Sequence, residues 1–95
     1  MLNKNEIIKY LKKNKEDFKI RFDVERIGLF GSYASNTQNE NSDIDIIVRM
    51  PSEYRSYFAL KKLLEDHFQK KIDIGLEKNL RLLIRDKIQK EIIYA

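Results

Sequence analysis

Residues 29–48 read LFGSYASNTQNENSDIDIIV, and this stretch decides the architecture of the 95-residue chain. Gly31 and Ser32 end one apolar run, and after ten further residues Asp43 and Asp45 appear at the start of the next. A buried strand has no use for two carboxylates, because burying an unpaired charge is costly. The stretch therefore predicts a turn and a strand that carry a functional site.

The apolar periodicity on either side of this stretch predicts the remaining elements. It indicates helices at 3–18, 52–69 and from 79 onward, and strands at 26–30, 44–50 and 71–76. Residues 36–42 are polar and predict a loop. We expect an α/β (α+β) fold in a single domain over residues 1–95, with a short mixed β-sheet and the helices packed on one of its faces.

The predicted helix starts carry capping residues. Asn3 with Glu6 three residues later is typical of a capping box, and Ser52 and Asn79 are candidate N-caps for the later helices. The last helix has an apolar stripe made of Leu80, Leu83, Ile84, Ile88 and Ile92.

Three carboxylates fall on predicted strands. Asp43 and Asp45 are two residues apart and should project from one strand face, where their like charges repel. Asp73 lies on the polar face of the next strand and joins them if the two strands are neighbours. Because Mg²⁺ prefers oxygen ligands and often binds substrate phosphates as well, this set predicts a site for two Mg²⁺ ions and for phosphoryl or nucleotidyl transfer.

The Gly-Ser turn predicts the phosphate-binding half of the site. Gly31 lets the backbone approach a ligand closely because it lacks a side chain, and Ser32 adds a hydroxyl group. If a short helix follows through Tyr33 and Ala34, its free N–H groups favour phosphate.

Composition excludes several other classes. The chain has no cysteine, so it has no disulfide framework, and its net charge of +4 is spread without a basic block, so we expect no direct nucleic-acid binding. No apolar run reaches the length of a membrane span, and charges in the first turns argue against a signal peptide. We expect a cytoplasmic protein.

Gly31-Ser32 followed at this spacing by Asp43-Ile44-Asp45, with Asp73 on a later strand, resembles the signature of the DNA-polymerase-β-like nucleotidyltransferase superfamily. The small size and the ending LRLLIRDKIQKEIIYA resemble the minimal nucleotidyltransferases within it. The resemblance spans nearly the whole chain and implies a short mixed sheet with flanking helices.

The resemblance also implies a function. Asp43, Asp45 and Asp73 would bind Mg²⁺ and carry catalysis, and Gly31 with Ser32 would hold the triphosphate of ATP. Many members are encoded beside a helical HEPN ribonuclease toxin, and in characterised systems the minimal enzyme is an antitoxin that transfers AMP from ATP to a tyrosine of that toxin. The resemblance therefore implies a hetero-oligomer with such a partner.

Two positions depart from the commoner family pattern. Ser35 stands where arginine is frequent, which removes a positive charge near the site. Asn36 stands where glycine is frequent, and asparagine tolerates the left-handed conformation that the turn needs.

Two other functions remain open at this point. The same fold could be a non-catalytic module that neutralises a HEPN partner by contact, and the missing arginine at position 35 favours this reading. A small-molecule nucleotidyltransferase is a further option, although those enzymes carry a second domain for the acceptor.

Overall fold

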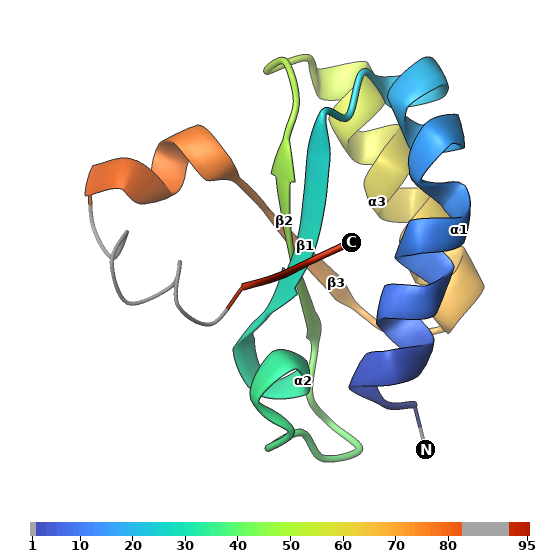
Figure 1. The fold of residues 1–95 in the computed structure, drawn as a ribbon, viewed down its shortest axis with the longest axis vertical. Coiled ribbons are helices and arrows are strands. Elements are labelled where there is room, and N and C mark those ends of the chain that lie inside the picture. Colours follow the sequence, from blue (N-terminus) through green and yellow to red (C-terminus); the bar gives the residue numbers. More distant parts are fainter. Residues whose placement is uncertain (1, 83–91) are drawn as a thin grey trace.

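The computed structural model describes residues 2–82 and 92–95 of the protein (Figure 1). Its elements follow in the order α1 (Lys4–Phe22), β1 (Arg26–Phe30), α2 (Gly31–Ser35), β2 (Ile44–Arg49), α3 (Tyr54–Phe68), β3 (Ile72–Leu76), the 3₁₀-helix η1 (Glu77–Leu82) and β4 (Ile93–Tyr94).

The strands form one mixed sheet in the order β3-β2-β1-β4. β1 pairs antiparallel with β2 and with β4, whereas β2 and β3 run parallel and are connected through α3. This confirms the predicted mixed sheet, and it makes the two carboxylate-bearing strands direct neighbours.

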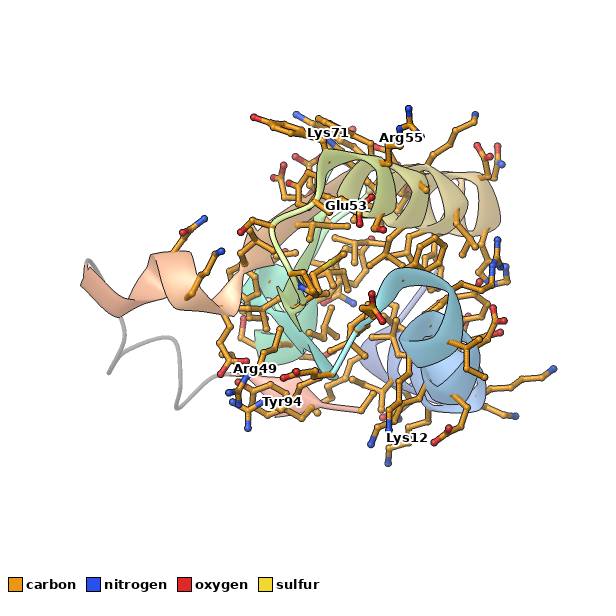
Figure 2. All side chains as sticks on the ribbon, turned by 90° about the horizontal axis from the view of Figure 1, so that it is seen from above. Lys12, Arg49, Glu53, Arg55, Lys71 and Tyr94 are labelled. Atoms are coloured by element: carbon orange, nitrogen blue, oxygen red, sulfur yellow. The ribbon has the colours of Figure 1, made fainter. Side chains whose placement is uncertain are left out.

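Helices α1 and α3 lie side by side on one face of the sheet, and η1 projects on the opposite side (Figure 1); the view turned by 90° shows the same layers (Figure 2). Alternation along the strands sends their apolar side chains into the space between sheet and helices. The fully buried residues of this core include Ile7, Leu11, Phe18, Ile27, Leu29, Ile44, Ile46, Leu60, Leu64 and Ile72.

Helix α1 begins with the predicted capping box. The Asn3 side-chain oxygen accepts a hydrogen bond from the Glu6 backbone N–H at 3.0 Å, and the Asn3 amide donates to the Glu6 carboxylate at 3.1 Å. The helix ends at Phe22, four residues later than predicted, because Asp23 takes the left-handed conformation (φ 57°) and donates its N–H to the Lys19 carbonyl.

Helix α3 starts later than predicted. Its N-cap is Glu53, which makes no side-chain capping hydrogen bond, and the hydroxyl of Ser52 contacts the ammonium group of Lys78 instead. The prediction that Ser52 caps this helix was therefore wrong. The helix packs on the sheet through Leu60 and Leu64, which are fully buried.

The C-terminal prediction was wrong in two respects. The 3₁₀-helix η1 begins at Glu77, before the proposed cap Asn79, and Ile92 precedes a strand instead of belonging to a helix. Strand β4 was not predicted; its pairing with β1 is extended by a 2.9 Å hydrogen bond from the Ala95 N–H to the Ile27 carbonyl. The proposed stripe residues at 83, 84 and 88 lie outside the described residues.

Over the described ranges 2–82 and 92–95, no helix is both long enough and apolar enough to cross a membrane.

Candidate active site

The turn between β1 and α2 requires glycine at position 31. Gly31 has φ +74°, a conformation that other L-residues rarely adopt. A Cβ built there would overlap the Oδ2 atom of Asp45 and lie 3.0 Å from its Cγ. The absence of a side chain at Gly31 therefore lets the turn sit directly on the Asp45 carboxylate.

The short helix expected after the turn is present as α2, and Asn36 ends it. Asn36 has φ 64°, so the prediction that asparagine keeps a left-handed turn at this position is confirmed. The Ser35 hydroxyl donates to the Gly31 carbonyl at 3.1 Å and lies 3.0 Å from the Thr37 hydroxyl. The Ser35 side chain thus stabilises the turn and adds no positive charge to it.

Tyr33 anchors α2 to the fold. Its ring is completely buried, and its hydroxyl group has no hydrogen-bond partner among the described residues. Burial of the ring holds the turn at the end of β1.

Asp45 lies at the centre of the site. In the sheet register it pairs with Phe30 on β1 and with Asp73 on β3, so Asp45 and Asp73 share one face at a backbone spacing of about 4.8 Å. Burial raises the pKa of the half-buried Asp45 carboxyl, and the negative charges of Asp73 and Asp43 raise that pKa further. The ionised form of Asp45 is thus less favourable here than in water, as expected for a carboxylate suited to a positively charged ligand.

Asp43 and Asp73 flank this centre differently. Asp43 immediately precedes β2 and is half-buried, so it is not on the strand itself as predicted, and its Oδ2 atom lies 3.8 Å from the Lys71 ammonium nitrogen. Asp73 lies within β3 and is exposed. The position of Lys71 beside Asp43 depends on the parallel β2–β3 pairing, which no local sequence pattern shows.

The carboxylates are suited to a divalent cation. In the described residues no three His, Cys, Asp or Glu side chains are gathered closely enough to form a complete metal-binding cluster. Mg²⁺ needs no such cluster, because it usually takes one or two carboxylates together with substrate phosphates and water. Neighbouring carboxylates on one sheet face, with the Asp45 pKa raised by burial and then by the nearby negative charges, supply this type of ligand set.

The site lies where β1 ends and where β2 and β3 begin. The turn reaches it from β1, Asp45 stands in the middle strand, and Asp73 stands on β3. A glycine turn beside neighbouring carboxylates is an arrangement suited to a nucleoside triphosphate together with a divalent cation.

Comparison with known proteins agrees with this chemistry. The family model for the nucleotidyltransferase domain matches residues 7–95. A Methanocaldococcus jannaschii protein named as a protein adenylyltransferase is 36% identical over 94 residues, which cover 96% of each chain. The protein adenylyltransferase MntA of Thermococcus cleftensis is 32% identical over 98 residues, which cover 100% of this chain and 98% of that one.

Solved structures share the fold. A structure described as a minimal nucleotidyltransferase matches with a TM-score of 0.72 and 26% identity, covering 90% of this chain and 93% of that chain. A toxin-antitoxin crystal structure with AMP-PNP matches with a TM-score of 0.56 and 34% identity; the match covers 81% of this chain, which spans 59% of the other. A mutant toxin-antitoxin complex, MntA-HpeT, matches with a TM-score of 0.62 and 26% identity over 98% of this chain and 71% of that one.

The turn, the neighbouring carboxylates, the family model and the relatives lead to one assignment. The chain belongs to the nucleotidyltransferase domain family and is a nucleotidyltransferase of the minimal type.

Proposed function

We propose that the protein transfers AMP from ATP to a tyrosine of a HEPN-type ribonuclease toxin and so acts as its antitoxin, in the cytoplasm and as a hetero-oligomer with that partner. The observation that carries this proposal is the position of Asp45, which touches the Gly31 turn and pairs in register with Asp73. The Asp45 carboxylate thereby lies between the proposed nucleotide site at Gly31 and the proposed acceptor site at Asp73.

Known proteins support the proposal by similarity. Relatives that cover nearly the whole chain are named protein adenylyltransferases, and toxin-antitoxin complexes share the fold. The MntA-HpeT mutant replaces two aspartates that are two positions apart with glutamates, and this is the spacing of Asp43 and Asp45.

The proposed roles follow from the positions of the residues. Gly31 and Ser32 would hold the β- and γ-phosphates, and Asp43 and Asp45 would bind both metal ions. Asp73 would bind the metal ion that faces the acceptor, and it takes the proton of the attacking hydroxyl group. The hydroxyl oxygen bonds to the α-phosphorus, the bond from the α-phosphorus to the bridging oxygen of the β-phosphate breaks, and pyrophosphate leaves.

Mg²⁺ is the metal that fits these ligands. Asp43, Asp45 and Asp73 would hold two ions, which when bound neutralise the phosphate charge and stabilise the attacking and leaving oxygens. The protein's own contribution is to place the carboxylates beside the turn before the nucleotide arrives.

Neutralisation by contact alone is the alternative. Ser35 favours it, because the hydroxyl bonds within the turn and offers no charge to a triphosphate. The two functions differ in one observable, which is a covalent change of the partner.

A label-transfer assay separates them. The purified protein, Mg²⁺ and ATP labelled on the α-phosphate are incubated with the toxin encoded beside it, using Asp43→Asn and Asp45→Asn as matched variants of equal size. We expect label on the toxin with the wild type only, and none when EDTA replaces Mg²⁺. Stable complex formation without label would overturn AMP transfer and leave the contact mechanism.

A further inference from the structure

The chain contains three glycines, and contacts among the described residues account for two of them. Gly31 is required by its positive φ and by Asp45. Gly28 is required by packing, since a Cβ there would lie 2.7 Å from Ile92 Cγ2 and 3.1 Å from Tyr94 Cδ1. Gly75 has neither reason: its φ lies outside the left-handed region, and no atom of the described residues lies within 4 Å of a Cβ built on it.

Glycine is a poor choice for the interior of a strand unless something needs the space. It loses more conformational freedom on folding than any other residue, and it has no side chain to pack. A strand glycine without a bend often marks a place where a ligand or another chain approaches closely. Gly75 is the fourth residue of the five-residue strand β3, and it stands in regular register opposite Ile47.

Gly75 adjoins the catalytic carboxylates. Alternation along the strand places it on the same face as Asp73, two residues away, or about 7 Å along the backbone. On the same face, two residues closer to the starts of β2 and β3, Asp45 lies beside Asp73. No described residue fills the space over Gly75, which lies next to the acidic row on the same face; this space is called the hollow below.

The strand order decides which reactant reaches this hollow. The Gly31 turn is at the end of β1, Asp45 is on β2, and Asp73 and Gly75 are on the edge strand β3. In an in-line displacement, the attacking and leaving oxygens stand on opposite sides of the phosphorus. If the triphosphate is bound at the Gly31 turn on the β1 side, the acceptor must approach from the β3 side.

We infer that the hollow over Gly75 receives the aromatic ring of a phenolic acceptor, with its hydroxyl group at Asp73. This inference rests on the proposed AMP transfer and makes Gly75 a specificity-determining position for the acceptor. The distance from Gly75 to Asp73 is one that a tyrosyl side chain spans and a seryl side chain does not. The phenol loses its proton to the Asp73 carboxylate as its oxygen bonds to the α-phosphorus and pyrophosphate departs.

Enlarging residue 75 tests the inference. We compare wild type, Gly75→Ala and Gly75→Val for AMP transfer to the toxin, for affinity toward a non-hydrolysable ATP analogue, and for thermal stability. The Val variant should lower kcat/KM for the toxin by roughly 100-fold, since misplacing a reactant by about 1 Å costs this much. The Ala variant should show a smaller loss, and both should keep wild-type nucleotide affinity and at least wild-type stability.

Gly28→Ala is the matched control, because it adds the same methyl group in the same row of the sheet. It should lower stability through its contacts with Ile92 and Tyr94, whereas Gly75→Ala should not. Transfer by Gly75→Val at the wild-type rate would overturn the acceptor site, and so would a loss of nucleotide affinity, which would assign the hollow to the nucleotide. Failure of the wild type itself to transfer AMP would instead overturn the proposed function on which the inference rests.

Discussion

At the scale of single residues, Asp45 carries opposing demands of stability and function. Its carboxyl is half-buried, lies against Gly31, and has its pKa raised by burial and by Asp73 and Asp43. Ionised Asp45 is therefore less favourable in the folded protein than in the unfolded chain. Functional sites commonly keep a charged group that destabilises the fold, because binding or catalysis requires that charge.

Replacing Asp45 with asparagine should separate these demands. Without a divalent cation at neutral pH, we expect the Asn variant to have a slightly higher melting temperature than the wild type, because it removes the repulsion without changing the shape. AMP transfer should fall by roughly 100-fold or more, as when a major electrostatic contribution is removed from an active site. Thermal denaturation and the transfer assay test the two parts, and a variant that is less stable would contradict the electrostatic reasoning.

The raised pKa of Asp45 also makes the stability of the protein depend on pH. Because the folded state binds the Asp45 proton more tightly than the unfolded state does, stability falls as pH rises from the ordinary value of 3.8 through the raised pKa. The stability difference between the Asn variant and the wild type should therefore shrink toward acidic pH. Melting curves from acidic to neutral pH test this sign, and a difference that widens in acid would contradict it.

Gly31→Ala should damage both fold and function. The positive φ costs a non-glycine residue about 1–2 kcal/mol, and the new methyl group must displace the Asp45 carboxylate or the turn. We expect a free energy of unfolding lowered by at least this amount, measured by urea denaturation. Wild-type stability in this variant would show that the turn can move away from Asp45.

At the scale of elements, two tyrosines offer a matched comparison. The Tyr57 hydroxyl on α3 donates to the Ile74 carbonyl on β3 at 2.8 Å, whereas the buried Tyr33 hydroxyl on α2 has no partner among the described residues. Tyr57→Phe should cost about 1 kcal/mol of stability, while Tyr33→Phe should be neutral or stabilising. Urea denaturation of both variants tests this contrast, and equal losses would contradict the assigned hydrogen bonding.

Elements with local signals were predictable from the sequence. The Asn3 and Glu6 capping box and the strand at Arg26–Phe30 depend on neighbouring residues, and both are confirmed. The Ser52 cap failed because a hydroxyl near a helix start is only one of several candidates for that position. Strand β4 could not be read from its two residues, since its pairing with Gly28 and Leu29 arises from tertiary contacts across the chain.

At the scale of the whole molecule, the site depends on strand order more than on any motif. The sequence indicates that Asp43, Asp45 and Asp73 lie near strands, but only the parallel β2–β3 pairing makes Asp45 and Asp73 neighbours. The close approach of Gly31 to Asp45 is likewise a product of the fold. Glycine, serine and aspartate at the right spacing could suggest the chemistry, whereas the space that no described residue fills at Gly75 depends on the tertiary structure.

In the proposed function, these carboxylates make the protein modify its partner covalently. The most direct measurement is the intact mass of the toxin co-purified from cells that express it with the wild type or with the Asp45→Asn variant. We predict a toxin with added AMP on a tyrosine in the first case and an unmodified toxin in the second. An unmodified toxin in both complexes would contradict the claim and would make the protein a partner that acts by contact alone.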